Sequence, residues 1–270
     1  MTATAHLARA GRSAGELTNR VSLAPAAAAL AVLAGSWELV GRIANVPFFP
    51  PLTTVLVRLR DMIADGLILD NLATSLTNLV LGFAISLAIA LVVGLLMGAF
   101  AKVEAALDIY VNALLTAPSL VFAPIFFSIW GLGRESIIAV VVMYSCFIMI
   151  INTAAGVRTV PRPLVEMGTS FSATRWQLFR FVVLPAATPL IMAGVRLGVG
   201  RAVKGMINGE MFIAVVGLGK LVQDAGRQLD AASVLAVLIV IVVVAFASVA
   251  VVQAVDNRLT SWLPQTARSR

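Results

Sequence analysis

The residues best placed to do chemistry in this chain are polar side chains inside an otherwise apolar stretch, residues 186–215. They are Arg196, Arg201, Lys204, Asn208 and Glu210. Ionisable groups inside a membrane are costly, and they usually face a water-filled cavity or a partner. Arg196, Lys204 and Asn208 are separated by multiples of four residues, which predicts a shared helical face. We therefore take these five residues as candidates for a pathway along which a polar solute crosses.

Reactive side chains are otherwise scarce. The chain has one cysteine, Cys146, within an apolar run, and one histidine, His6, near the N-terminus. That scarcity argues against a bis-histidine haem, a histidine metal cluster and a serine–histidine membrane protease. The nearest approach to a nucleotide-binding loop is "AVVGLGKL" at 214–221, which lacks the first glycine and the hydroxyl residue after Lys220. We expect no catalytic residue, no metal site and no cofactor in this chain.

The composition predicts a protein that crosses a membrane several times. Of 270 residues, 60% are hydrophobic and only 12% are charged, too few to cover a soluble domain. The net charge of +7 is better explained by lysine and arginine retained on the cytoplasmic side than by a nucleic-acid partner.

Charge-free stretches long enough to cross a bilayer define the expected helices, since a span needs about 20 apolar residues. They are residues 21–37, 71–101, 109–133, 136–157 and 231–255, and the polar-bearing stretch 186–215 makes a sixth. Only helices satisfy the backbone of such spans, so the predicted fold is all-α. The expected organisation is an N-terminal tail at 1–20, a transmembrane domain at 21–257 and a C-terminal tail at 258–270.

The distribution of basic residues predicts the orientation. The two tails and the connection at 158–180 belong to one side, and that side carries roughly twice the lysines and arginines of the other. Both termini are therefore expected in the cytoplasm. The longest outer connection, residues 44–70, starts with prolines and then repeats apolar residues at helical spacing, which predicts a short helix at the membrane interface.

The cytoplasmic connection at about 158–185 is amphipathic. On a helical wheel, at about 100° per residue, one stripe of apolar side chains forms: Leu164, Met167, Phe171, Leu178 and Val182. One or two short helices fit this pattern. On amphipathicity alone, a helix that packs on its own bundle at the interface explains the segment better than a docking element.

This connection resembles the cytoplasmic loop of permease subunits of ATP-binding cassette (ABC) importers. That loop has the pattern Glu-Ala-Ala, three residues, Gly, nine residues, Ile-x-Leu-Pro. Here the pattern falls on Glu166, Met167, Gly168, Ser172, Leu184 and Pro185 with its spacing intact. The chain departs from it where Ala-Ala is Met-Gly and where Gly is Ser, and serine tolerates the tight turn between the short helices less well than glycine does.

Four further stretches resemble the subfamily that imports nitrate, sulfonates and taurine. They are "FFPPLTTVL" at 48–56, "SLTNLVLGF" at 75–83, "LTAPSLVFAPIFFSIWGLG" at 115–133 and "TRWQLFRFVVLPAATPLIMAGVRLGVGRA" at 174–202. In the second stretch Asn78 stands where the subfamily usually has arginine. The resemblance covers roughly residues 37–260.

The resemblance implies a permease of the type I ABC importer fold in a bacterial-type inner membrane. Its implied partners are two ATPase subunits that hold ATP and Mg²⁺, a second permease copy, an extracytoplasmic solute-binding protein and lipid. Glu166 and Arg175 would pair with the ATPase, and Leu184–Pro185 would end the rigid connector. A stand-alone secondary transporter is the alternative, although the chain lacks the internal repeat that such proteins carry.

Within the polar stretch, the roles stay open. For Arg196 and Arg201 we favour structural bonds to backbone carbonyls or neighbouring helices, because the resemblance places arginines there whatever the solute. Lys204 stands where the look-alikes have an apolar residue, which favours an anionic solute, and a Lys204–Glu210 or inter-subunit ion pair explains it equally well. The glycines at 194, 198 and 200 predict close helix packing.

Overall fold

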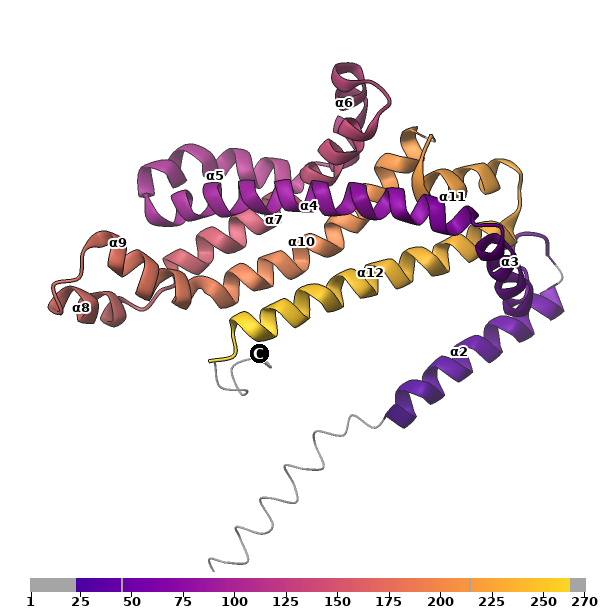
Figure 1. Cartoon of the computed structure of the whole chain (residues 1–270), viewed down its shortest axis with the longest axis horizontal. Coiled ribbons are helices and arrows are strands. Elements are labelled where there is room, and N and C mark those ends of the chain that lie inside the picture. The colour runs from indigo at the N-terminus through magenta and orange to yellow at the C-terminus, as the bar shows by residue number, and fades with distance from the viewer. Residues whose placement is uncertain (1–22, 45, 214, 263–270) are drawn as a thin grey trace, which may run out of the picture.

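The computed structural model describes residues 23–44, 46–213 and 215–262, and these contain helices and no strand (Figure 1). Five helices are long and apolar enough to cross a membrane, and a bent helix pair makes a sixth if it counts as one span. The all-helical class and the expected number of spans are thus confirmed. The tail predicted at 1–20 and residues 263–270 of the tail predicted at 258–270 lie outside the described residues.

The helices follow one another with short connections. Their bounds are α2 Leu23–Ala44, α3 Leu52–Ala64, α4 Leu67–Ala99, α5 Ala101–Thr116, α6 Ala123–Trp130, α7 Arg134–Arg158, α8 Arg162–Ser170, α9 Arg175–Leu178, α10 Leu184–Ile213, α11 Gly217–Arg227 and α12 Ala231–Leu259. A 3-10 turn, Ser119–Phe122, precedes α6, and a π-helical turn, Phe179–Val183, precedes α10.

Four long helices, α4, α7, α10 and α12, lie side by side and form the body of the protein (Figure 1). At one end lie the short helices α8 and α9, and at the other lie α3 and α11. We call these the α8 end and the α11 end. Helix α7 packs between α4 and α10. Of the residues in its most apolar 18-residue stretch, 56% are buried, a larger share than in any other described span. Helix α7 is therefore the central helix of the bundle.

Small residues let these helices approach closely, as the sequence predicts for two of three glycines. A Cβ on Gly198 of α10 would lie 2.6 Å from the Met149 side chain of α7, and one on Gly194 would meet Asn152. Gly200 has open space around it, so it does not pack closely against another described helix of this chain. Backbone contact of this kind supplies the van der Waals packing that holds helices together in lipid.

The third predicted span, residues 109–133, is not one straight helix. Helix α5 ends at Thr116, and the helical segments on either side of the break are bent by 98°. The cause is Pro118, which disfavours helical geometry at the residue before it. Ala117 accordingly has an extended ψ of 142°. Helix α6 therefore leaves the layer of long helices, as Figure 1 shows.

The first span is longer than predicted, and the extra turns hold the outer connection. Helix α2 extends to Ala44 and contains Glu38, whose Oε2 accepts a hydrogen bond from the backbone N–H of Thr53 at 2.9 Å. Thr53 Oγ1 and Arg42 Nε donate to the other oxygen at 2.9 and 2.6 Å. A carboxylate beside the first turn of α3 satisfies a backbone donor that the helix itself leaves free.

The short helix predicted within residues 44–70 is α3, and it is docked on the bundle. Val55 and Met62 are buried, whereas Ile63 is 42% exposed, so only part of the predicted apolar repeat faces inward. Arg58 Nε donates to Ser233 Oγ at 2.7 Å beside the start of α12. The α11 end is thus held by polar contacts as well as by packing.

Candidate functional site

The amphipathic connection of the sequence forms a helical hairpin at the α8 end. Helix α8 carries Glu166, Met167 and Gly168, and α9 leads through the π-helical turn into α10 (Figure 1). The two short helices that the wheel predicts are therefore present. They pack on each other where Gly168 meets the side chain of Leu178, a contact too close to leave room for a Cβ without movement of the leucine.

Ser172 makes the turn between the two helices. Its φ is +59°, in the left-handed region where non-glycine residues are uncommon. Ser172 N donates to Thr169 O at 2.8 Å and Ala173 N donates to Gly168 O at 3.2 Å. These two bonds form a Schellman motif, which usually has glycine at this position. The sequence singled out this residue because serine stands there in place of the family's glycine. The structure shows that serine does form the tight turn, at a conformational cost.

A capping box that we did not predict starts the second helix. Thr174 Oγ1 accepts the N–H of Gln177 at 3.3 Å, and Gln177 Oε1 accepts the N–H of Thr174 at 2.7 Å. The spacing Thr-x-x-Gln was the signal that predicts this arrangement. Because both ends of the turn are hydrogen-bonded, the hairpin is a stiff element.

The predicted apolar stripe divides into an inner and an outer part. Leu178 and Val182 are partly buried and lie nearest to Gly168, whereas Met167 is 53% exposed and Phe171 is 81% exposed. The turn at Ser172 ends the first helix, so the two halves of the stripe cannot continue one face. The hairpin therefore presents apolar side chains outward instead of burying all of them.

Two aromatic residues that the sequence analysis did not single out enlarge this exposed surface. Trp176 is 65% exposed and stacks on Phe179 with ring centroids 5.9 Å apart. Phe181 is 69% exposed and lies 5.8 Å from the guanidinium of Arg180. We call Phe171, Trp176 and Phe181 the hairpin aromatics. Large exposed aromatics next to charges are typical of protein interfaces.

The charged residues of the hairpin are exposed. Within the part of the chain that the structure describes, the side chains of Glu166 and Arg175 form no ion pair. Arg158, just before the hairpin, is instead paired with Glu104 of α5. Glu166 and Arg175 therefore keep their charges available for a partner molecule.

Leu184–Pro185 does not end the connector, contrary to our prediction. Leu184 is helical, with φ −63° and ψ −47°, and residues 175–213 form one continuous apolar helical run. The π-helical turn at Phe179–Val183 takes up the strain, because a wider turn accommodates the proline ring and its missing N–H. The hairpin is thus joined to α10 without a flexible break.

The polar residues of α10 do not share one face. A four-residue spacing drifts by about 40° at each step, so Arg196 and Asn208 are about 120° apart around the helix. Arg196 turns to α12 and pairs with Asp256, whose carboxylate also accepts from Thr260 at 3.3 Å. A structural role for Arg196 agrees with this contact, whereas no ion pair of the described residues involves Arg201.

Glu210 lies on the side of α10 opposite Arg201, about 180° around the helix, and it is fully buried. Its Oε2 accepts from Ser75 Oγ at 2.8 Å and from Gly219 N at 3.1 Å, and its Oε1 accepts from Asn78 Nδ2 at 3.2 Å. Lys204 is exposed, and among the described residues it makes no ion pair with Glu210. The predicted Lys204–Glu210 pair is therefore not formed, and Glu210 instead ties α10 to α4 and α11.

Lys204, Arg201 and Asn208 lie close together around α10. Asn208 Nδ2 donates to the hydroxyl of Tyr144 on α7 at 2.8 Å. Lys204 and Arg201 lie within about 60° of Asn208 around the helix. Helix α10 thus has a polar face of two cations and an amide, and we keep the name polar face for Arg201, Lys204, Asn208 and Tyr144.

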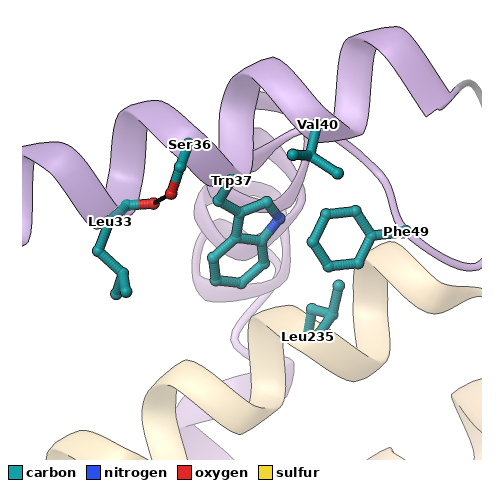
Figure 2. Close-up of a pocket in the computed structure, with 6 residues that line it drawn as sticks. All are labelled: Leu33, Ser36, Trp37, Val40, Phe49 and Leu235. Atoms are coloured by element: carbon teal, nitrogen blue, oxygen red, sulfur yellow. Dashed lines mark hydrogen bonds between the residues drawn. The ribbon is translucent and has the colours of Figure 1, made fainter.

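Two apolar cavities lie away from the polar face. Figure 2 shows one of about 340 Å³ between α2 and α12, lined by Leu33, Trp37, Val40, Phe49 and Leu235, where the Ser36 hydroxyl donates to the backbone of Leu33. A larger one of about 720 Å³ lies among α4, α5, α6 and α7. Neither offers a set of polar groups for a charged solute, and no cluster of three metal-ligating side chains occurs in the described residues.

The described residues form an all-helical bundle with several spans long enough to cross a membrane, which is the class of an integral membrane protein. Residues 86–261 match the family described as "Binding-protein-dependent transport system inner membrane component", and the chain belongs to this family. It is a permease subunit of an ABC importer. The stand-alone secondary transporter is thereby set aside.

Curated relatives span most of the chain. The taurine transport system permease protein TauC of Escherichia coli is 30% identical over 86% of this chain and 87% of its own length. The riboflavin transport system permease protein RibX of Chloroflexus aurantiacus is 31% identical over 84% and 85%. The putative aliphatic sulfonates transport permease protein SsuC of Bacillus subtilis is 28% identical over 86% and 85%.

Among solved structures, the chain is similar in fold to one from an inward-facing form of the MetNI methionine ABC transporter. The match has a TM-score of 0.58 and 19% identity, and it covers 72% of this chain and 94% of the other. This likeness supports the type I importer fold expected from the sequence.

Proposed function

We propose that this permease pairs with a second copy of itself, binds two ATPase subunits at the α8 end and receives a small anionic solute from an extracytoplasmic binding protein at the α11 end. ATP and Mg²⁺ are held by the ATPase subunits. This chain supplies the path and the mechanical connection. Both termini lie in the cytoplasm of a cell with a bacterial-type inner membrane.

The observation that carries the proposal is the hairpin at the α8 end. It is closed by a Schellman motif and a capping box, it exposes the hairpin aromatics, and it continues into α10 as one helical run. A push on the hairpin is therefore transmitted to α10 instead of being absorbed by a loop. An ATPase that closes on ATP needs a connector of this kind, and large exposed aromatics give it an anchor.

The same end carries the charges that favour a cytoplasmic location. Arg158, Arg162, Arg175 and Arg180 lie in or beside the hairpin, and Lys102 starts α5 nearby. Lysine and arginine next to spans are retained on the cytoplasmic side. The ATPase-binding hairpin and both ends of the chain are then on the side where ATP is available.

The polar face supports both the second copy and the anionic solute. Lys204 is exposed in a single chain, yet a lysine at the centre of a span costs about 2.5–3.5 kcal/mol on insertion scales. Water and a second permease copy around a shared path remove that cost. Two cations without a carboxylate partner among the described residues favour an anion there. Relatives named for taurine and for aliphatic sulfonates agree with this charge, whereas one named for riboflavin does not decide it.

The test is ATP-driven uptake by the assembled complex in proteoliposomes, with taurine as the first solute tried and ethanesulfonate as the second. Glu166→Lys should lower ATPase binding and uptake together while the permease still inserts, because the hairpin loses a charge that faces the partner. Asp65→Lys, an exposed charge reversal at the α11 end, is the matched control and should leave ATPase binding unchanged. Normal ATPase binding by Glu166→Lys would remove the hairpin from the coupling role.

A further inference from the structure

Tyr144 is a polar side chain that contacts α10 next to Lys204 and Asn208. Tyr144 lies on α7, the most buried of the described spans, and its side chain packs against α10 at Gly205. A Cβ on Gly205 would lie 2.9 Å from Tyr144 Cβ and 3.0 Å from Cγ. The glycine therefore lets the ring lie directly against the α10 backbone, one residue after Lys204.

The hydroxyl of Tyr144 can still donate a hydrogen bond. Asn208 Nδ2 donates to this oxygen at 2.8 Å, so the hydroxyl acts as an acceptor toward α10. A tyrosine hydroxyl can donate one hydrogen bond in addition. Among the described residues no acceptor takes that bond. A half-buried O–H donor inside a span without an acceptor is costly unless water or a ligand supplies one.

The donor lies beside cations and at membrane depth. Lys204 is one helical turn before Asn208, and Arg201 lies within about 60° on the same side. Residues 204–208 are five to nine positions from the end of α10 at Ile213, or about 8–14 Å along the helix axis. That distance lies within a hydrocarbon core of about 30 Å. Lipid tails would leave all of these groups unsatisfied.

We propose that Tyr144 and Lys204 together bind the anionic group of the solute, and that Tyr144 determines specificity by donating a hydrogen bond to an oxygen that Lys204 does not occupy. This inference rests on the proposed function. A sulfonate or carboxylate has at least two acceptor oxygens, which matches one ammonium and one hydroxyl donor. A halide is a single atom and does not offer two separate acceptor oxygens. Asn208 orients the hydroxyl and is a positioning residue.

The experiment measures binding of ethanesulfonate to the purified complex of permease and ATPase in nanodiscs, by the ligand-dependent shift of its melting temperature. Chloride at equal ionic strength and neutral methanesulfonamide are the reference probes. The wild-type complex should be stabilised by ethanesulfonate and by neither reference. Tyr144→Phe should weaken the apparent affinity about tenfold, the effect of one lost hydrogen bond to a charged group. Lys204→Met should weaken it at least as much.

The chain provides a matched control, because Tyr110 is its other tyrosine and is 65% exposed on α5. Tyr110→Phe should bind ethanesulfonate as the wild type does. Asn208→Ala leaves Tyr144 in place and should weaken binding about two- to threefold through lost orientation. It keeps the test decisive if Tyr144→Phe fails to assemble.

Three results would overturn the inference: equal stabilisation by chloride and ethanesulfonate, wild-type affinity in Tyr144→Phe, or wild-type affinity in Lys204→Met. If Tyr144→Phe fails to assemble, wild-type affinity in Asn208→Ala overturns it instead. Co-elution of the permease with its ATPase is scored on the same samples. Loss of co-elution in the wild type would instead contradict the proposed function. An assembled wild type that ignores ethanesulfonate contradicts only the inference about Tyr144.

Discussion

Replacing Ser172 by glycine should tighten the turn that joins α8 to α9. The φ of +59° at this residue is a left-handed conformation that costs an L-residue about 1–2 kcal/mol. Glycine adopts it freely but gives up about 0.5–1 kcal/mol more conformational entropy when it is ordered. The difference leaves a net stabilisation of the turn of about 0.5–1 kcal/mol.

Hydrogen exchange at the amide of Ala173 measures this stabilisation locally. That amide donates to Gly168 O across the turn, so it exchanges only when the turn opens. Ser172→Gly should slow its exchange about two- to fivefold. Ser172→Ala keeps the Cβ and should exchange like the wild type. Exchange in Ser172→Gly that equals or exceeds that of Ser172→Ala would refute the strain at this turn.

Ser172→Pro tests the opposite direction. Proline fixes φ near −65° and removes the N–H that bonds to Thr169, so the Schellman motif cannot form. The hairpin should lose protection from exchange on both sides of residue 172 while the long helices keep theirs. ATPase binding should fall with it, because the stiff connector is gone.

Three further predictions concern the rest of the chain. In a cysteine-free background, Asp65→Cys should react with an impermeant thiol reagent added outside intact cells and Thr169→Cys should not; the reverse pattern would invert the orientation. Glu210→Ala should lower the free energy of unfolding of the solubilised protein by about 3 kcal/mol, because three buried donors lose their acceptor. Glu210→Gln should have a smaller effect. Melting temperatures equal to the wild type would show that this carboxylate does not stabilise the contacts of α10 with α4 and α11. Burial alone would raise the pKa of Asp230, but hydrogen bonds from Ser233 and the nearby Arg58 outweigh it and hold the pKa below the ordinary value of an aspartate. This carboxylate therefore stabilises the α11 end above its unfolded pKa, and the contribution is lost as pH falls through the folded pKa. Hydrogen exchange in α3 should therefore accelerate below about pH 4, and Asp230→Asn should show the acid rate at pH 7.

The long spans were predictable because length and hydropathy are local properties. Residues 231–255 and 136–157 were placed as helices, and the structure shows α12 and α7 there. The break at Pro118 was not predicted, although proline disfavours a helix at the residue before it. Pro185 is an exception to that rule. The helix continues past it because a π-helical turn precedes it, and no residue pattern predicts such a turn.

The candidate site was predictable in its residues and not in its contacts. Spacing placed Arg196 with Asn208, but the drift of a real helix turned Arg196 toward Asp256, on a helix sixty residues away in sequence. Tyr144 was missed because only the packing of α7 on Gly205 brings its hydroxyl to Asn208. Partners across helices depend on the packing of the whole bundle, which a single sequence does not display.

Docking of an ATPase on the hairpin is tested most directly by site-specific cross-linking in the assembled transporter. Phe171→Cys, in a chain whose Cys146 is replaced by serine, carries the cross-linker at the most exposed of the hairpin aromatics. Leu132→Cys, 62% exposed between α6 and α7, is the control away from the α8 end. We predict that mass spectrometry identifies an ATPase with an intact phosphate-binding loop in the Phe171→Cys adduct and none in the Leu132→Cys adduct. Absence of the ATPase from the Phe171→Cys adduct, or its equal presence in both, would contradict the assignment of the hairpin as the ATPase-coupling element.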